Sequence, residues 1–223
     1  MLDLAVIVNN FTFLVVQGLL GLGGFTGGTL RLAIPAIVLG FVLGIFIGIA
    51  RLARAWWISV PATLYVEFFR GVPLVMVIFW IWFIIPQLLR LPIPEYGVAL
   101  TAFVIFEAAY FGEIVRAGIQ SVPRGQVEAA TALGLTRAQS MRYVVLPQAI
   151  RNMVPSLVTQ MIVLFKDTSL ASIIGYVDLT KAAQIVNNRE FRPFELYLFI
   201  AVVYFIFTYS MSRIAGRFER RLA

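Results

Sequence analysis

The chain has 223 residues, of which 61% are hydrophobic and 13% charged, and its formal net charge is +7. Soluble domains are about 45–50% apolar and about 25% charged, so this composition excludes a soluble globular domain and indicates an integral membrane protein. Cysteine and histidine are both absent, which excludes disulfides, thiolate or imidazole metal sites, cysteine nucleophiles and histidine acid–base relays, and no metal or cofactor is expected on this chain. Any large soluble catalytic module is expected on another polypeptide.

The first 28 residues form the least regular segment. Residues 4–22 are apolar enough to suggest a span, but Asn9, Asn10 and Gln17 interrupt them and several glycines follow. We therefore expect an interfacial or loosely packed helix here, with an additional span as the alternative.

Five later segments are long and apolar enough to cross the hydrocarbon core of a membrane, which takes about 20 residues. They are residues 32–50, 71–89, 96–117, 152–177 and 196–212. This pattern predicts an all-α membrane fold. Its expected parts are an N-terminal interfacial segment over residues 1–28, a transmembrane domain over residues 29–217 with a long loop at residues 118–151, and a tail over residues 218–223.

The basic residues between these segments are unevenly distributed. Most flank the spans on one side: Arg51, Arg54, Arg70, Arg116, Arg124, Arg137, Arg142, Arg151, Arg213, Arg217, Arg220 and Arg221. The other side receives Arg31, Arg90, Lys181, Arg189 and Arg192. Cytoplasmic loops carry the excess of lysine and arginine, so the C-terminus is predicted in the cytoplasm and the N-terminus outside.

The loop between the third and fourth spans is too polar to cross a membrane and is patterned like two short helices. Pro123 suits the first turn of one helix, and Gly134 suits its C-terminal cap. Thr136 followed by Gln139 predicts a capping box that opens a second helix, which Pro147 is expected to kink or end. The pattern favours a compact cytoplasmic knob, with a solvated or re-entrant connector as the alternative.

The same loop carries a recognisable motif. Its residues stand at the spacing of the Glu-Ala-Ala, Gly, Ile-x-Leu-Pro signature, with Val144 at the isoleucine position; they are Glu128, Ala129, Ala130, Gly134, Leu146 and Pro147. The chain therefore resembles the permeases of ABC importers.

Flanking stretches narrow the resemblance to the polar amino acid uptake branch. They are Phe69–Leu74, Phe106–Tyr110 with Glu113 and Arg116, and Lys166–Leu170. Two further stretches, Pro73–Val77 and Gly118–Ser121, resemble glutamate and aspartate permeases.

The resemblance implies the type I ABC importer permease fold, with five transmembrane helices, in the inner membrane of a bacterial cell. It implies three partners: a dimer of ATP-binding cassette ATPases, a second permease chain that is identical or homologous, and a periplasmic or lipoprotein amino acid binding protein. The knob would be a coupling helix that docks into the ATPase through Glu128, Ala129, Ala130, Gly134, Arg124, Arg137, Leu146 and Pro147. Nucleic acid is not an expected partner.

ATP and its Mg²⁺ would bind the partner ATPase and not this chain. A P-loop needs the pattern Gly-x-x-x-x-Gly-Lys, and neither Lys166 nor Lys181 follows a glycine. The chain is therefore expected to be a non-catalytic transport subunit.

Ionisable residues inside a span are costly and indicate function by default. The fourth span contains Lys166, Asp167, Thr168 and Ser169, which are candidates for the substrate pathway because an amino acid needs a donor for its carboxylate and an acceptor for its ammonium group. A buried structural pair is the alternative for Lys166 and Asp167.

The third span carries a polar stripe at three-residue spacing: Glu107, Tyr110, Glu113 and Arg116. Pairing of Glu113 with Arg116 is favoured over substrate contact, and Arg70 is expected to anchor one membrane entrance. The polar segment 176–195 is either a docking surface for a binding protein or a solvated helix.

Two other classes of function remain open from the sequence. One is a secondary transporter or channel subunit that uses Lys166 and Asp167 for ion coupling, although no internal repeat is evident. The other is a membrane enzyme that relies on intramembrane carboxylates.

Overall fold

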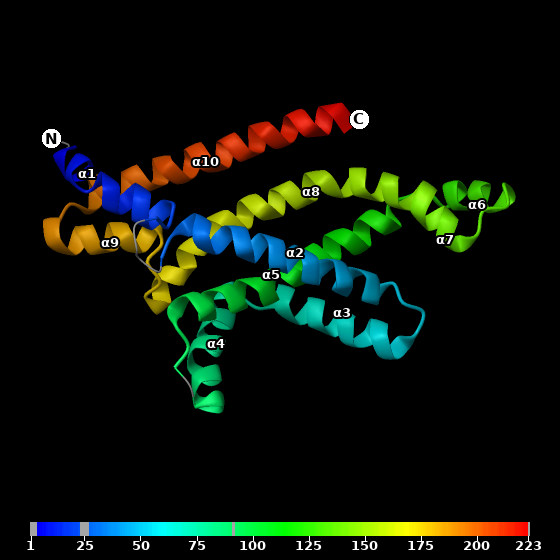
Figure 1. Ribbon diagram of the computed structural model, residues 1–223, viewed down its shortest axis with the longest axis horizontal. Helices are drawn as coiled ribbons and strands as arrows, with labels where there is room; N and C mark the ends of the chain where they lie inside the picture. Colours follow the sequence, from blue (N-terminus) through cyan, green and yellow to red (C-terminus); the bar gives the residue numbers. More distant parts are fainter. Residues whose placement is uncertain (1–3, 23–26, 91, 223) are drawn as a thin grey trace.

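The computed structural model describes residues 4–22, 27–90 and 92–222, and these are helical almost throughout with no strand among them (Figure 1). Four long helices, α2 (Thr29–Arg51), α5 (Glu95–Gln120), α8 (Leu146–Asp167) and α10 (Pro193–Leu222), run lengthwise through the molecule. The predicted all-α fold is confirmed. Helices α2, α5 and α10 each cover one predicted span and extend it at both ends, because polar end residues continue the helix beyond the apolar core. Helix α8 covers most of the fourth predicted span and begins before it.

Helices α2 and α5 pack closely through glycines. Gly40, Gly44 and Gly48 of α2 recur every four residues and are buried. A Cβ atom on Gly44 would lie 2.6 Å from the Cβ of Phe111, and one on Gly48 would lie 2.6 Å from the carbonyl oxygen of Gly112. Membrane helices associate through close backbone packing of this kind, so the glycines set both the separation and the register of α2 and α5.

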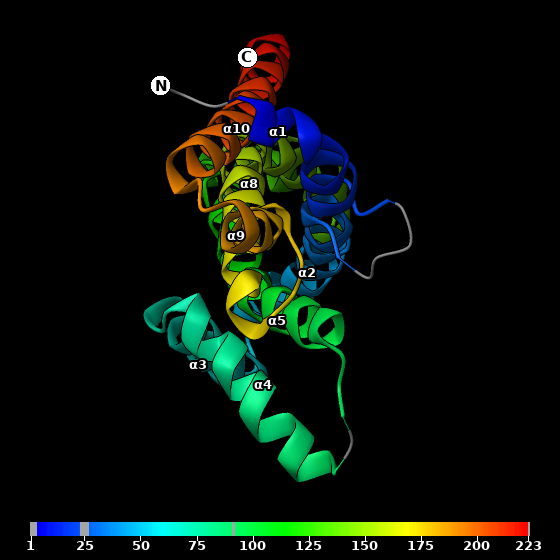
Figure 2. The same cartoon turned by 90° about the vertical axis from the view of Figure 1, so that its left-hand side faces the viewer.

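The second predicted span is part of a bent pair of helices, α3 (Trp56–Gly71) and α4 (Leu74–Leu89), which meet at 105°. Pro73 disfavours helical backbone at Val72, so α3 ends at Gly71 and a new helix begins. Figure 2 shows α4 leaving the bundle at a steep angle. By length and composition, the described residues contain four candidate spans, or five when α3 and α4 count as one broken span.

Arg54 and Arg70, which the sequence analysis groups on one side of the membrane, are separated by α3. Helix α3 has 16 residues and is about 24 Å long. Arg54 precedes its first turn, whereas Arg70 lies in its last turn. The sequence prediction treated the residues before Gly71 as a connector and missed α3.

The predicted knob consists of α6 (Arg124–Ala132) and α7 (Arg137–Ser140), and it projects beyond the ends of α2 and α5 (Figure 1). Pro123 precedes α6 directly, and Gly134 has a φ of 80°, a conformation that glycine adopts without steric cost. The capping box is confirmed: the Gln139 amide N–H donates to the Thr136 hydroxyl, and the Thr136 amide N–H donates to the Gln139 side chain.

Pro147 was predicted to kink or end the second helix, and it does not end it. A π-helical stretch, η2 (Met141–Val145), joins α7 to α8, and the helix continues past Pro147. The wider π turn accommodates a proline, which lacks an N–H and would clash with a regular preceding turn. Helix α8 then passes into a 3₁₀ segment, η3 (Thr168–Ile174).

The N-terminal segment packs at the end of the molecule opposite the knob (Figure 1). It forms two short helices, α1 (Ala5–Asn9) and η1 (Thr12–Leu19), and η1 lies against α9 (Leu179–Glu190). Leu14 and Leu19 are buried, and the Thr29 hydroxyl donates to the Gly18 carbonyl and accepts from the Leu179 amide. These two helices are each too short to cross a membrane.

Substituting a buried glycine of α2 tests the close packing. Gly44→Ala should destabilise the detergent-solubilised protein by about 1–3 kcal/mol, because the added methyl group forces α2 and α5 apart. The measurement is thermal unfolding of the purified chain. Gly216→Ala is the matched control, since a Cβ there meets no atom within 4 Å; equal melting temperatures for the two variants would contradict the packing argument.

Candidate functional site

Glu113 of α5 lies at the centre of a cluster of arginines from three helices. Arg51 at the end of α2 pairs with its Oε2 atom. Arg116 makes two hydrogen bonds, from Nε to Oε2 at 3.0 Å and from Nη2 to Oε1 at 2.5 Å. Arg70 of α3 approaches Oε1 at 3.9 Å. The predicted pairing of Glu113 with Arg116 is confirmed, and the structure adds two arginines that lie far from Glu113 in the sequence.

The cluster carries more positive charge than Glu113 alone can neutralise. Arg51 and Arg116 already occupy both oxygens of its carboxylate. Arg70 makes only the longer ion pair and a contact with the face of the Tyr110 ring, with its guanidinium carbon 5.6 Å from the ring centroid. Its side chain is 44% exposed, against 10% for that of Arg51. Arg70 is therefore the cation of this cluster that is accessible to a ligand.

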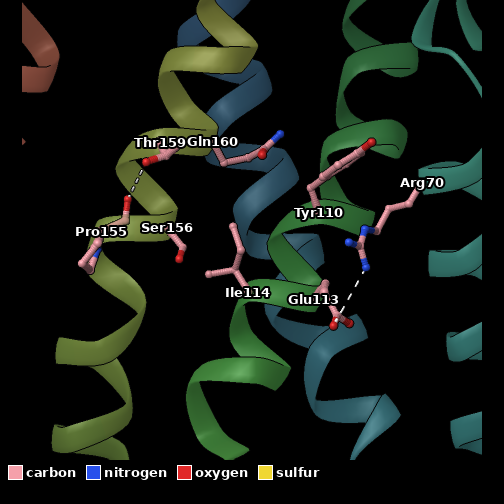
Figure 3. A pocket seen from close by; sticks show the side chains of 8 residues that line it. All are labelled: Arg70, Tyr110, Glu113, Ile114, Pro155, Ser156, Thr159 and Gln160. Carbon is pink, nitrogen blue, oxygen red and sulfur yellow. Dashed lines mark hydrogen bonds and ion pairs between the residues drawn. The ribbon is translucent and has the colours of Figure 1, made fainter. Parts of the chain in front are cut away.

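A cavity of about 370 Å³ opens beside the cluster, between α3, α5 and α8 (Figure 3). Arg70 forms one side, and α5 contributes Tyr110, Glu113 and Ile114. The opposite side is α8, which presents three polar side chains, Ser156, Thr159 and Gln160.

A second cavity of about 240 Å³ continues from the first towards the knob, along α5 and α8. The two cavities share Glu113, Ile114 and Ser156, and the second ends near Ser121 and Asn152, whose side chains are joined by a 2.8 Å hydrogen bond. We call this pair of cavities the α5–α8 groove. The groove exposes polar side chains of α5 and α8, two helices that are otherwise mainly apolar.

Glu107 lies deeper, six residues before Glu113 on α5, and is fully buried. Its Oε2 atom accepts a 2.9 Å hydrogen bond from the Gln160 amide, while its Oε1 atom is buried with no partner in the part of the chain that the structure describes. This bond fixes the orientation of the Gln160 amide at the edge of the groove, with its nitrogen turned to Glu107.

The four predicted pathway residues lie at the end of α8 and the start of η3, and they do not line the groove. Lys166 is exposed, and Asp167 is half-buried on the same helix face as Gln160, two turns further on. The Thr168 hydroxyl is buried and donates to the Phe165 carbonyl at 2.7 Å. Ser169 is half-buried.

Sequence reasoning singled out Arg70, Tyr110 and Glu113 but missed the residues of α8 that line the groove. Ser156, Thr159 and Gln160 recur at the three- and four-residue spacing of one helix face inside an apolar span, which is a signal that the sequence contains. Nothing in the sequence indicated that Arg51 and Arg70 pair with Glu113, because only the fold brings them together.

The residues predicted to couple to an ATPase lie on the knob or just after it. Ala130 is buried, with 3% of its surface exposed. The others are exposed: Arg124, Glu128, Ala129, Gly134, Arg137, Leu146 and Pro147. Large apolar side chains accompany them, and Leu133 is 82% exposed. An exposed apolar patch rimmed by charges is typical of a protein interface.

The arrangement suits binding and movement of a solute more than covalent chemistry. Among the described residues no group of acidic side chains is placed to hold a metal ion. The groove supplies a cation, hydroxyls and an amide, which can orient a small polar molecule through hydrogen bonds.

Removing the central carboxylate should destabilise the bundle. Glu113→Gln leaves the partly buried arginines without their counter-charge, at a cost on the order of 3 kcal/mol. Adding Arg51→Gln to this variant should restore part of the loss, as measured by thermal unfolding in detergent. Glu128→Gln, at an exposed position on α6, is the control; a Glu113→Gln melting temperature equal to that of this control would show that the cluster does not hold the helices together.

Comparison with known proteins gives the family. Residues 36–223 match the model of the binding-protein-dependent transport system inner membrane component. The chain is 42% identical over 202 residues to the glutamate/aspartate import permease protein GltK of Escherichia coli O6:H1, covering 87% of this chain and 90% of that protein. It is 40% identical over 197 residues to the probable glutamine ABC transporter permease protein GlnP of Bacillus subtilis, covering 86% and 89%.

Solved structures agree with this assignment. A crystal structure of an amino acid ABC transporter with histidines contains a chain that is 36% identical, superposes with a TM-score of 0.91 and covers 99% of each chain. The MetNI methionine ABC transporter, at 19% identity and a TM-score of 0.77, shares the fold. Permeases of this class are transport components, and the nucleotide binds a separate ATPase. The chain belongs to the binding-protein-dependent inner membrane components and is a multi-pass, non-catalytic permease subunit of an amino acid ABC importer.

Proposed function

We propose that this permease carries an acidic amino acid, glutamate or aspartate, across the inner membrane by alternating access. The observation that carries the proposal is the surplus positive charge at the α5–α8 groove, where Glu113 is shared by Arg51, Arg116 and Arg70. An unneutralised cation within a membrane is costly, so a substrate with negative charge is favoured over a neutral one. The identity of 42% to a glutamate/aspartate permease supports this choice, and the 40% identity to a glutamine permease makes glutamine the competing substrate.

The knob is proposed to transmit the action of an ATPase dimer. Its coupling surface comprises the exposed Glu128, Ala129, Arg124, Arg137, Leu146 and Pro147, with Ala130 and Gly134 maintaining its shape. The helix that begins in the knob at Arg137 continues through α8 to the groove. A movement of the knob would therefore be transmitted along a rigid helix to Ser156, Thr159 and Gln160.

The orientation follows from the charges around the knob. Arg51 and Arg54 precede α3 at the knob end, and Arg124 and Arg137 lie on the knob itself. The positive-inside rule then assigns this end to the cytoplasm and α9 to the outside. The residue boundaries proposed from the sequence are kept: an outer segment over 1–28, a transmembrane domain over 29–217 and a cytoplasmic tail over 218–223.

The remaining partners fit this arrangement. A second permease chain, identical or homologous, would complete the pathway, and a periplasmic or lipoprotein binding protein would deliver the amino acid near α9. Lys166, Asp167, Thr168 and Ser169 lie between α9 and the groove, and we propose that they form the outer entrance of the pathway.

Reconstitution tests the proposed function. Proteoliposomes that contain the permease, its ATPase and a loaded binding protein should take up glutamate or aspartate only when ATP is present, and glutamine should compete poorly. Equal uptake of glutamine would contradict the acidic specificity, and uptake without ATP would contradict the importer mechanism.

Substitution at the knob turn tests the coupling. Gly134→Val places a β-branched residue at a φ of 80°, where no atom clashes with the side chain but the backbone is strained. The distorted turn should lower ATP-driven uptake by at least about tenfold while membrane insertion is unchanged. Gly216→Val, at an open helical position, is the control. Uptake by Gly134→Val at the level of this control would show that the turn does not couple the ATPase to transport.

A further inference from the structure

The cluster at Glu113 leaves one arginine free to bind a ligand. Arg51 and Arg116 hold both oxygens of the Glu113 carboxylate, and Arg51 also donates to the Thr63 hydroxyl at 3.4 Å. Arg70 approaches from α3 at a longer distance, 3.9 Å, and lines the cavity. Figure 3 shows its guanidinium on the opposite side of the cavity from α8.

The α8 side of the same cavity presents hydrogen-bond acceptors. The Gln160 amide nitrogen donates one of its two protons to Glu107, and the amide carbonyl oxygen can accept a hydrogen bond from a ligand. The Thr159 hydroxyl donates its proton to the Pro155 carbonyl at 3.0 Å, so its oxygen can only accept from a ligand. The Ser156 hydroxyl adds a third oxygen on this side.

The cavity therefore has opposite polarity on its two sides. A planar guanidinium matches a carboxylate through two parallel hydrogen bonds, and an ammonium group donates three hydrogen bonds and accepts none. The volume of about 370 Å³ lies within the usual range for small-molecule sites. Glutamate and aspartate carry a side-chain carboxylate and an ammonium group, which match a cavity with a cationic donor on one side and acceptors on the other.

We propose that Arg70 binds the side-chain carboxylate of the transported acidic amino acid, and that Gln160 and Thr159 accept hydrogen bonds from its ammonium group. This inference rests on the proposed function and adds the residues that hold the substrate. Lys166 is not the carboxylate ligand, because its side chain does not line the cavity.

Glu107 has a positioning role in this site. It touches no part of the cavity surface, but its hydrogen bond to Gln160 turns the amide so that the carbonyl oxygen is presented. Glu107→Leu should allow the Gln160 amide to rotate and weaken substrate binding. Glu107→Gln should rescue binding in part, because the amide carbonyl oxygen introduced at position 107 can still accept from Gln160.

The test is equilibrium binding of radiolabelled glutamate and aspartate to the purified permease–ATPase complex, together with ATP-driven uptake by the complete transporter. Arg70→Gln should weaken binding at least about tenfold, the effect of one charge-assisted hydrogen-bonded contact, and Arg70→Lys should fall between this variant and the wild type. Glutamine and asparagine, whose side-chain carboxylate is replaced by an amide, should compete weakly with both labels in the wild type and lose this disadvantage in Arg70→Gln. Arg54→Gln, at an exposed position before α3, is the control.

The outcomes separate the two proposals. If the wild-type complex takes up amino acid with ATP but Arg70→Gln binds within twofold of the wild type, the inference about Arg70 is overturned and the proposed function stands. If the wild type transports without measurable binding to the complex, the inference is also overturned. If the wild type shows no ATP-driven uptake of an acidic amino acid, the proposed function fails and the Arg70 site fails with it. Copurification of the ATPase with each variant shows that the variants assemble.

Discussion

The close contact between α2 and α5 determines where the charges of this permease lie. Three glycines on α2 allow its backbone to approach that of α5, and the resulting register places Arg51, at the end of α2, beside Glu113. In a membrane there is little hydrophobic drive between helices, so packing of this kind and buried polar contacts hold the bundle together. A larger side chain at Gly44 would separate the helices and leave Glu113 and Arg51 apart in an apolar medium.

The electrostatics of the groove follow from this placement. Because Arg51 and Arg116 neutralise Glu113 from two directions, Arg70 approaches a carboxylate whose hydrogen-bonding capacity is already used. The bend between α3 and α4 ends α3 beside the groove and so brings Arg70 to it. Helix α8 supplies the other side and connects it to the knob. One cluster thus links the packing of the bundle to a polar groove and to the surface where an ATPase would act.

Much of the fold could be predicted from the sequence, because spans and caps are local signals. The apolar runs predicted the long helices, the capping box of Thr136 and Gln139 was confirmed, and so was the pairing of Glu113 with Arg116 three residues away. Helix α3 was missed because its flanking arginines suggested a connector. The pairing of Arg51 with Glu113 joins residues that are 62 positions apart, so it depends on the packing of α2 against α5. The groove combines Arg70 and Glu113 with hydroxyls and an amide, and the uncharged polar residues of α8 stand out less in the sequence than charges within a span do.

Substrate protection of a single cysteine tests the α5–α8 groove most directly. The chain has no cysteine, so Ser156→Cys gives a unique thiol in the groove, and Ser212→Cys, at an exposed position on α10, gives a matched control. In the assembled transporter, we expect a water-soluble thiol reagent to label the cysteine at position 156 more slowly when glutamate or aspartate is present, while labelling at position 212 is unchanged. Labelling at position 156 that is fast and unaffected by every amino acid that the transporter carries would contradict the assignment of this groove as the substrate pathway.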